Sequence, residues 1–430
     1  MRRARRAKPS ARRLPFATWW RRPRRRRNRY AGARVEHDGR VAIADAADLR
    51  EPRRFFERFV ARRAPCIIQR APEELEGLAD ALWTSQIARD LEIQVEVRDG
   101  PADSFGKGRR VPTTFGALLD GGSPNLYLTT QEVPEGQLLA APLTAIATQL
   151  PLRPALLGNL VPQSINLWLG RSQAPASSGL HHDFHDNLYV LLRGRKRFRL
   201  FSPADAHRMA LHGRLRHVHS NGRINYVGQP PTTADGREPE DRAAAAVDAA
   251  QRAQRRAEAR LQQAEEAADA EEPGAAEQLE QAEEGLDAAM DRVAAARSAR
   301  SRLRKQQRRQ QQGQPPPEPS APGPAAPPSF SRIGNLANEL GGTRSSFPSL
   351  AGARMAECEL RAGELLYLPA GWFHEVSSDG GGASGGLHCA LNYWYHPPQV
   401  GAPYKAPHGR EGQRFWEREW RKVGGGGNRV

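Results

Sequence analysis

The stretch Leu180-His181-His182-Asp183-Phe184-His185-Asp186-Asn187-Leu188-Tyr189 decides the fold. On an extended segment side chains alternate between two faces, so His181 and Asp183 point to the same side. A third ligand from a distant strand would place two histidines and one carboxylate on one face of a metal ion. This arrangement leaves coordination positions open and suits Fe(II). Gly371-Trp372-Phe373-His374 offers such a histidine far downstream.

A His-x-Asp triplet alone is weak evidence, but a lysine that follows it adds weight. Arg193-Gly194 separates two strand-like runs and is typical of a tight hairpin. On the returning strand Lys196 shares a face with apolar residues, whereas Arg197 and Arg199 share the opposite face. We expect the arginines to face solvent and Lys196 to point inward, where a buried lysine needs an anion. A dicarboxylic cosubstrate would supply that anion; alternatively, Lys196 lies at a barrel mouth and reaches water.

Several motifs in order resemble the jumonji-C (cupin-like) family of Fe(II)/2-oxoglutarate oxygenases. The similarity is closest to its small peptidyl-lysyl hydroxylases and to the hypoxia-inducible-factor asparaginyl hydroxylase. It spans residues 50–219 and 340–396. Besides the run quoted above, the motifs that carry it are Ala64-Pro65-Cys66-Ile67-Ile68, Asn125-Leu126-Tyr127-Leu128, Ile165-Asn166-Leu167-Trp168-Leu169-Gly170, Arg361-Ala362-Gly363-Glu364-Leu365-Leu366-Tyr367-Leu368-Pro369-Ala370-Gly371-Trp372-Phe373-His374 and Leu391-Asn392-Tyr393-Trp394-Tyr395.

The resemblance implies a mainly β fold, a double-stranded β-helix (cupin or jelly-roll barrel) with flanking helices. It also implies a set of ligands for Fe(II), 2-oxoglutarate and O2. The iron ligands would be His181, Asp183 and His374. The distal carboxylate of 2-oxoglutarate would contact Lys196, Tyr127 and Ser178, and its metal-chelating end would lie near Asn187 and Asn392. Family members often carry threonine where Ser178 stands, and a glycine-rich turn at 380–386 lengthens the path to Asn392.

Other polar and aromatic residues beside these motifs have structural interpretations. We expect His182 to be exposed on the opposite strand face and Glu375 to face solvent. His388, in a late strand, is expected to be a hydrogen-bonded core histidine. Trp168 and Trp372 are expected to pack in the core and not to contact a cofactor.

Charge is concentrated at the start of the chain. The first 30 residues contain 13 arginines, one lysine and no acid, which gives +14 of the total +16 and leaves +2 for the other 400 residues. We expect residues 1–32 to be a disordered basic tail. Arg24-Arg25-Arg26-Arg27 is typical of a nuclear-localisation or nucleic-acid-binding patch. The expected location is therefore the nucleus or cytoplasm; an organellar transit peptide, for the mitochondrion or plastid, is the alternative.

Two further classes of protein are disfavoured by the sequence. No apolar run approaches the length that crosses a bilayer, so we expect no membrane partner. Cys66, Cys358 and Cys389 are isolated, which fits buried thiols in a reducing compartment and not a disulfide framework or a zinc site.

A large insertion is predicted at 220–340, between catalytic segments 33–219 and 341–400. Residues 240–312 are rich in alanine at heptad spacing, and Glu271-Glu272-Pro273-Gly274 interrupts them, which predicts an antiparallel helical hairpin. The proline-rich Gln314–Ser329 would be an extended spacer. The hairpin could be a lineage-specific addition, a partner-binding element or a brace beside the substrate groove.

The end of the chain, 401–430, predicts a short helix and a flexible tail. Trp416 and Trp420 lie one turn apart on this helix and form one aromatic patch. The patch would either bind a second subunit, giving a homodimer, or pack on its own barrel.

The function predicted from these features is hydroxylation of a protein side chain, most closely a lysine, with succinate and CO2 as coproducts. The chain contains no zinc-binding reader module, so a histone or protein lysine demethylase is the less favoured outcome of the same chemistry. Two more functions fit the sequence less well. One is an RNA-associated oxygenase that binds nucleic acid through the N-terminal arginines, and the second is a non-catalytic cupin-like scaffold.

Overall fold

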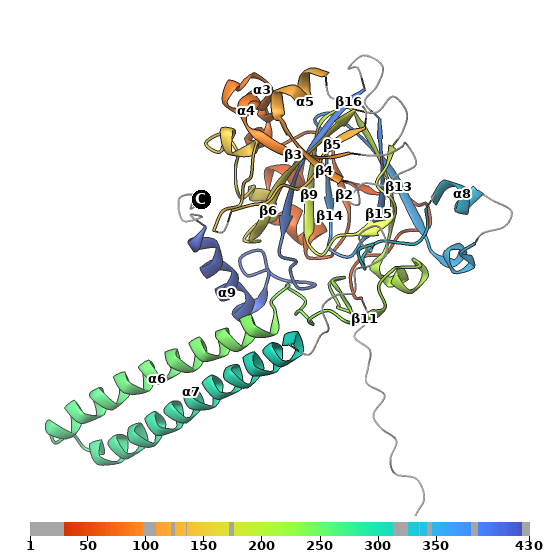
Figure 1. Ribbon diagram of the computed structural model, residues 1–430. Helices are drawn as coiled ribbons and strands as arrows, with labels where there is room; N and C mark the ends of the chain where they lie inside the picture. The colour runs from red at the N-terminus through yellow and green to blue at the C-terminus, as the bar shows by residue number, and fades with distance from the viewer. Residues whose placement is uncertain are drawn as a thin grey trace, which may run out of the picture.

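Two β-sheets packed face to face form the body of the molecule, and a long helical arm projects from it (Figure 1). A computed structural model describes residues 30–97, 109–121, 125–134, 136–171, 176–312, 326–334, 336–341, 346–379 and 386–423. The expected basic tail up to residue 29, most of the proline-rich spacer, the glycine-rich turn at 380–385 and the end after residue 423 lie outside these residues.

The larger sheet has nine strands, and every pairing except the parallel β1–β2 pair is antiparallel. Short β-rich segments with an apolar inner face favour this layout over parallel strands joined by helices. In spatial order the strands are β1 (Ala42–Ile43), β2 (Cys66–Ile68), β14 (Leu365–Leu368), β9 (Asp186–Arg193), β16 (Leu387–Tyr395), β6 (Pro162–Arg171), β5 (Leu126–Leu128), β3 (Glu92–Val97) and β4 (Arg109–Thr114).

The smaller sheet has five strands, and a separate two-stranded ribbon lies beside it. The five strands are β13 (Met355–Arg361), β10 (Arg195–Phe201), β15 (Phe373–Asp379) and β7 (Ala176–Ser177), with β8 (His181–His182) also paired to β15. The ribbon consists of β11 (Leu215–Val218) and β12 (Ile224–Tyr226). The mainly β, jelly-roll prediction is confirmed.

The two sheets share a core made by alternate residues of their facing strands. Tyr189 and Leu191 on β9 pack with Phe198 and Leu200 on β10, and all four are buried. The alternation on β10 is the predicted one, because Lys196 is buried with Phe198 and Leu200. Burial of each large apolar side chain stabilises the fold by about 1.5–3 kcal/mol, so the apolar pattern determines which face of each strand turns inward.

Helices cover the other face of the larger sheet. The segment before Pro65 has apolar residues at helical spacing and forms α1 (Ala46–Arg50), α2 (Pro52–Phe55) and the π-helix η1 (Phe56–Val60). Its Phe55, Phe56 and Val60 are all buried. The remaining short helices are η2 (Glu73–Leu75), α3 (Leu78–Thr84), α4 (Gln86–Asp90), α5 (Phe115–Gly121), η3 (Leu143–Ile146), η4 (Ala155–Leu157), η5 (Pro203–Arg208), α8 (Leu336–Gly341) and η6 (Pro348–Gly352).

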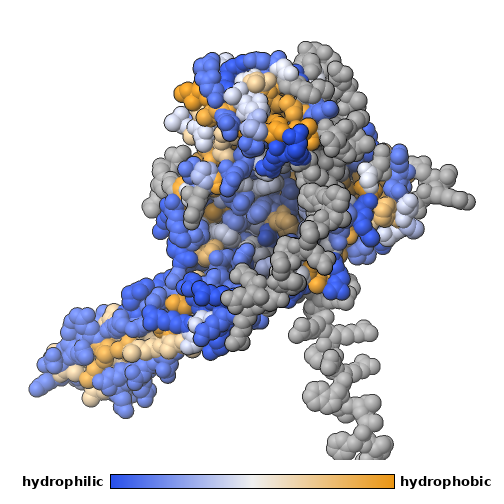
Figure 2. Space-filling model, in the orientation of Figure 1, coloured by the Kyte–Doolittle hydropathy of each residue, from blue (hydrophilic) through white to orange (hydrophobic). Residues whose placement is uncertain are grey.

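The arm is the predicted antiparallel hairpin. It consists of α6 (Pro239–Asp269) and α7 (Ala275–Gln312). Pro239 begins α6 at a position where its missing N–H costs nothing, and Gly274, with φ of 83°, lies in the turn before α7. Figure 2 shows the arm as mainly hydrophilic surface with a narrow apolar band along it, as expected for two helices that bury only one seam.

The chain on both sides of the arm is part of the body and not of the projecting insertion. Ile224 and Tyr226, before the arm, share a buried cluster with Ile333 and Leu336, after it, and with Phe373 of β15. The part that projects is therefore narrower than the expected range 220–340.

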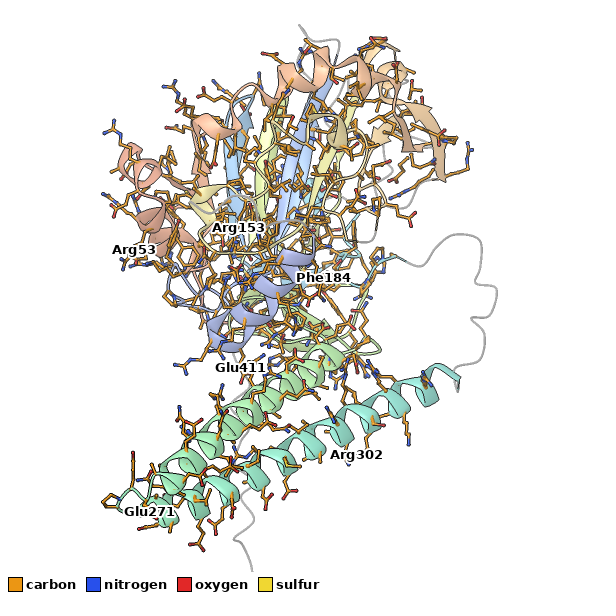
Figure 3. All side chains as sticks on the ribbon, turned by 90° about the vertical axis from the view of Figure 1, so that its left-hand side faces the viewer. Arg53, Arg153, Phe184, Glu271, Arg302 and Glu411 are labelled. Carbon is orange, nitrogen blue, oxygen red and sulfur yellow. The ribbon has the colours of Figure 1, made fainter. Side chains whose placement is uncertain are left out.

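The C-terminal helix α9 (Gly409–Lys422) joins the arm to the body. Trp416 and Trp420 are buried with Phe415 in a cluster that also contains Ala245 of α6, so the aromatic patch is covered by its own chain. Arg418 of α9 forms an ion pair with Asp248 of α6. Figure 3 shows Glu411, at the start of α9, beside the base of the arm, and Glu271 at its tip.

A buried ion pair connects the N-terminal segment to both halves of the barrel. Arg63 and Asp186 form a two-pronged pair, and neither side chain is exposed. Asp186 also accepts hydrogen bonds from the Tyr367 hydroxyl (2.6 Å) and the Ala370 amide (3.0 Å). These donors satisfy the carboxylate, which is the condition under which a buried charge is tolerated.

Among the described residues, none of the helices combines the length and the apolar character that crossing a membrane requires.

We predict that Arg63→Met lowers the free energy of unfolding by about 3–5 kcal/mol, because it leaves Asp186 as a buried charge without its cation. Urea denaturation followed by circular dichroism measures this loss. Arg53→Met is the matched control, since Arg53 lies on the surface (Figure 3) and its side chain is 71% exposed in its pair with Glu57. Equal urea midpoints for the two variants would contradict the assigned role of the buried pair.

Candidate functional site

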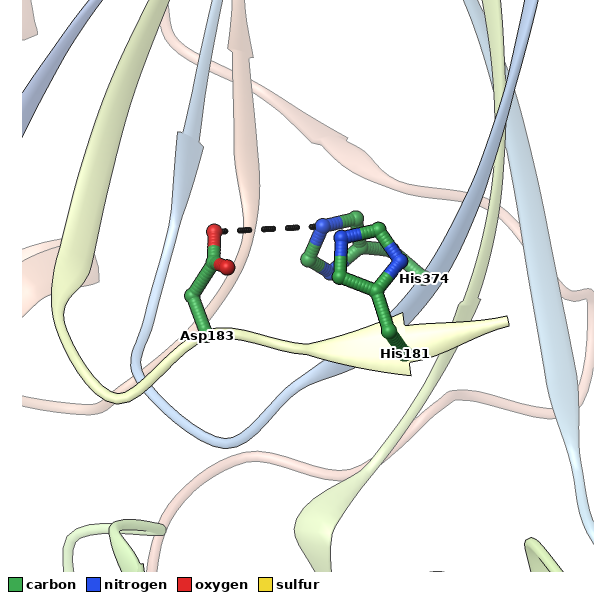
Figure 4. A group of neighbouring side chains, drawn as sticks. All are labelled: His181, Asp183 and His374. Atoms are coloured by element: carbon green, nitrogen blue, oxygen red, sulfur yellow. Dashed lines mark ion pairs between the residues drawn. The ribbon is translucent and has the colours of Figure 1, made fainter. Parts of the chain in front are cut away.

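His181, Asp183 and His374 meet at one end of the space between the sheets (Figure 4). His181 on β8 and His374 on β15 are direct partners in the antiparallel pairing, and Asp183 follows β8 immediately. Their ligand atoms lie within 4.8 Å of one another, and His374 Nε2 is 3.9 Å from Asp183 Oδ2. The Gly371 amide donates a hydrogen bond to the Asp183 carbonyl (2.9 Å), which holds the two segments together.

The histidines are oriented by backbone carbonyls. His181 Nδ1 lies 2.9 Å from the Gly179 carbonyl, and His374 Nδ1 lies 3.1 Å from the Trp372 carbonyl. Since only an N–H can bond to a carbonyl oxygen, both Nδ1 atoms are the donors, and Nε2 is the ring atom of each histidine that faces the other ligands. This outer-shell support is typical of metal-binding histidines.

The donor set fits a divalent transition metal. Burial and then the neighbouring His374 lower the pKa of His181 to about 4, so its ring is neutral at pH 7 and able to bind a cation. Two imidazoles and one carboxylate on one side of an ion match the two-histidine, one-carboxylate set of non-haem Fe(II) oxygenases.

Lys196 lies deeper in the same cavity, as the alternation on β10 predicted. It is 1% exposed and donates hydrogen bonds to Ser378 Oγ (2.5 Å) and His388 Nδ1 (3.2 Å). Burial lowers its pKa to about 7. No carboxylate pairs with Lys196 within the described residues, so an anion that enters the cavity would find a cation already desolvated.

The structure brings all the other predicted site residues to this cavity. Tyr127 and Asn392 come from the larger sheet, and the Tyr127 ring lies 5.9 Å from Lys196 Nζ. Asn392 Oδ1 accepts a hydrogen bond from Trp168 (3.0 Å), and Ser178 Oγ accepts one from the Val376 amide (3.0 Å). Asn187 is different, because its buried Oδ1 has no hydrogen-bond partner in the described chain. A ligand in the cavity is the natural partner for that atom.

The cavity has a volume of about 320 Å3 and is strongly aromatic. Asp183 is its one acid among the described residues, whereas Arg110 and Lys196 supply two cations. The aromatic rings that line it belong to Tyr127, Trp168, Tyr189, Phe198, Phe330 and Trp394. The site therefore combines a cation-binding end at the histidines with an anion-binding end at Lys196.

Sequence reasoning missed Phe330, which follows the arm and the spacer. Its ring stacks on His181 at 4.7 Å between centroids and 11° between planes. Hydrogen bonds hold this segment between the start of β8 and residues 211–212: the Ser331 amide donates to the Leu180 carbonyl (2.8 Å) and the His212 amide to the Phe330 carbonyl (2.9 Å). The proline-rich composition gave no signal for these bridges, although Phe330 is the first aromatic residue after it.

Ser378 and His388 were not predicted as contacts of Lys196 either. Ser378 stands opposite Lys196 in the pairing of β10 and β15, so it could have been found once that register was known. His388 was expected to be a hydrogen-bonded core residue, and it is fully buried.

Two expectations about neighbouring residues are wrong. His182 is buried and not exposed, because Tyr226 covers it and lies 2.6 Å from its Nε2. Glu375 does not face solvent, since β15 is an inner strand and Arg199 (3.0 Å) and Ser177 (2.8 Å) from its neighbours bind the carboxylate. Trp168 packs against Tyr127 and Trp394, and it also lines the cavity. Trp372 is a packing residue as expected.

Comparison with known proteins agrees with this geometry. The sequence profile of the cupin-like domain matches residues 52–400. JmjC domain-containing protein 4 of Schizosaccharomyces pombe is 29% identical over 416 residues, which cover 86% of this chain and 87% of that protein.

Two further relatives match shorter parts. The human protein named bifunctional peptidase and (3S)-lysyl hydroxylase JMJD7 is 30% identical over 171 residues, covering 36% of this chain and 52% of that protein. Lysine-specific demethylase JMJ32 of Arabidopsis thaliana is 50% identical over 44 residues, covering 10% of this chain and 12% of that protein. Because the cupin-like profile covers most of the chain and the observed fold is the one it implies, the chain belongs to the cupin-like, jumonji-C family of Fe(II)/2-oxoglutarate oxygenases.

Proposed function

We propose that this protein is an Fe(II)- and 2-oxoglutarate-dependent hydroxylase of a protein side chain. The observation that carries the proposal is the pairing, in one cavity, of a His-Asp-His group with the buried cation of Lys196. A dicarboxylate long enough to reach from the metal ligands to Lys196 would meet complementary charge at both ends. A purely structural barrel has no need for an unpaired buried lysine, which argues against a non-catalytic scaffold.

Each group would have a distinct task. His181, Asp183 and His374 would hold iron, with the two carbonyl-bonded Nδ1 atoms keeping the rings in orientation. When bound, iron and 2-oxoglutarate supply the oxidising chemistry that inserts one atom of O2 into a C–H bond and yields succinate and CO2. Lys196, Tyr127 and Ser178 would bind the distal carboxylate, and Asn187 and Asn392 would contact the chelating end.

Lysine is the proposed target side chain. It is supported by the name of the human relative, which includes lysyl hydroxylase and of which about half is matched. Within the cavity, Trp394 and Phe330 offer aromatic faces that attract an ammonium group, whereas no second carboxylate among the described residues lines it. We infer that the lysine stem lies along these rings, with its carbon chain toward His181 and His374.

The proposed ligand role of Asp183 predicts that Asp183→Ala loses iron and turnover together, because two histidines alone bind Fe(II) weakly. Metal content after anaerobic reconstitution and succinate formation measure the two losses. Asp80→Ala, on an exposed helical position, is the matched control and should retain both. An Asp183→Ala protein with wild-type iron content would sink the assignment.

Mass spectrometry tests whether the target residue is a lysine. Substrate proteins are first captured by binding to inactive enzyme and are then identified. Incubation with wild-type enzyme, Fe(II) and 2-oxoglutarate should add one oxygen to a lysine of the substrate. Loss of a methyl group from a methylated lysine would instead indicate a demethylase. Oxidation of a nucleobase in bound RNA would indicate an RNA-associated oxygenase.

The lowered pKa of Lys196 predicts that cosubstrate binding depends on pH. Its pKa is about 7 without an anion, and the protonated form binds the carboxylate, so binding raises that pKa. Affinity for 2-oxoglutarate should be constant below about pH 7 and fall by up to about tenfold per pH unit above it. Calorimetric titration at several pH values measures this slope. Lys196→Met should bind weakly with no such slope; a wild-type slope in that variant would refute the role of Lys196.

A further inference from the structure

The outer helix of the arm carries an exposed stripe whose charge reverses at its midpoint. In both Figure 1 and Figure 3, α6 lies between the body and α7, so the outward side of α7 is not covered by the described chain. We call the following positions the α7 stripe, and all are exposed: Ala276, Glu280, Glu283, Asp287, Met290, Ala294, Arg297, Ser301, Arg304 and Arg308.

The stripe has the geometry of a helix-packing surface. Its members alternate by four and three residues, which is heptad spacing. Each member from Glu280 to Arg297 directly follows a residue of the seam with α6, such as Leu279, Ala289 or Val293, so the stripe lies about 100° around the helix from that seam. A helix in a four-helix bundle presents two adjacent faces of this kind, one to each neighbour.

The charges of α7 are completely separated along its length. Residues 275–291 contain six acids and no base, whereas residues 292–308 contain seven bases and no acid. Glu280 and Arg304 each lie 12 residues from residue 292, Asp287 and Arg297 each lie five, and Met290 and Ala294 each lie two. Rotation of a second α7 about a two-fold axis at residue 292 therefore brings Glu280 opposite Arg304 and Asp287 opposite Arg297. The other charged members meet uncharged residues, since Glu283 faces Ser301 and Arg308 faces Ala276.

We propose that a second copy of this chain packs its α7 antiparallel on this stripe, so that two arms form one four-helix bundle. A two-fold interface uses the same surface on both chains, and an antisymmetric charge pattern is complementary to itself only in the antiparallel direction. A parallel alignment would place Glu280 against Glu280 and Arg304 against Arg304. Met290, which is 51% exposed, would pack against Ala294 of the other copy at the centre.

Most charges of the stripe have no ion-pair partner within the described part of one chain. Arg300 and Arg304 both pair with Glu240 of α6 (2.9 and 2.7 Å). In the part of the chain that the structure describes, Glu280, Asp287 and Arg297 have no ion-pair partner. Apart from Arg304, which already pairs with Glu240, the charged side chains of the stripe therefore remain available to a second copy.

The attachment of the arm to the barrel determines where the two barrels would lie in the dimer. Ala245 packs in the α9 cluster and Asp248 pairs with Arg418, so the base of the arm is held against the barrel. With the tip of each arm against the base of the other, the two barrels would stand at opposite ends of the bundle. Both cavities would then remain open to separate substrate molecules.

A charge-swap experiment on the full chain tests the proposal. Sedimentation equilibrium should give a wild-type dimer that weakens as NaCl rises from about 0.1 to about 1 M, because screening shortens from about 10 to about 3 Å. Asp287→Arg and Arg297→Asp alone should each weaken dimerisation by about tenfold or more, since each replaces two attractive contacts by two repulsive ones. An equimolar mixture of the two variants should dimerise like the wild type, because every contact in the heterodimer is again attractive.

Arg302→Asp is the matched control, since Arg302 is exposed on another side of the same helix and lies outside the stripe. It should dimerise like the wild type. Asp287 and Arg297 are ten residues apart on one helix and cannot contact each other, so recovery in the mixture cannot come from repair within one chain. A monomeric wild type at low salt, a dimer unaffected by either single change, or a mixture that stays monomeric would each overturn the proposal.

Discussion

The Arg63–Asp186 ion pair is the constraint on which the rest of the structure depends. Asp186 lies three residues after Asp183, and it accepts a hydrogen bond from Ala370, four residues before His374. The pair therefore holds the two ligand-bearing segments at a fixed separation. Arg63 belongs to neither segment; it comes from the N-terminal helical region and also donates to the Asn221 carbonyl (3.0 Å) and the Tyr367 hydroxyl (3.1 Å). One buried cation thus links four parts of the chain that are far apart in sequence.

Sequence patterns predicted the structure correctly where it depends on residues that are close together in the chain. The alternation on β10 predicted that Lys196 is buried, and the Glu-Glu-Pro-Gly interruption predicted the turn of the arm. Patterns failed where a distant segment covers a surface. His182 is buried by Tyr226, which lies 44 residues later. Glu375 is buried by Arg199 and Ser177, which lie 176 and 198 residues earlier. The Arg63–Asp186 pair could not be predicted from residue spacing either, because its two members lie 123 residues apart.

The insertion contributes to the molecule in two separate ways. Its returning end supplies Phe330, which stacks on His181 and forms part of the cavity wall. Its helical part projects away from that wall and carries separated charge along α7. A single stretch of chain that interrupts the barrel in sequence therefore completes the barrel in space. For the same reason, deletion of the arm should preserve residues 326–334, because they belong structurally to the catalytic body.

The order of the strands in the chain has a consequence for synthesis on the ribosome. His181 and Asp183 leave the ribosome long before His374, because 190 residues, including the whole arm, separate Asp183 from it. At about 5–20 residues per second that interval is about 10–40 s. During it β9 lacks β14 and β16, and β10 lacks β13 and β15, so both have open edges. The nascent barrel therefore stays half built and prone to aggregation during this interval, and the three proposed metal ligands come together only after His374 has been synthesised.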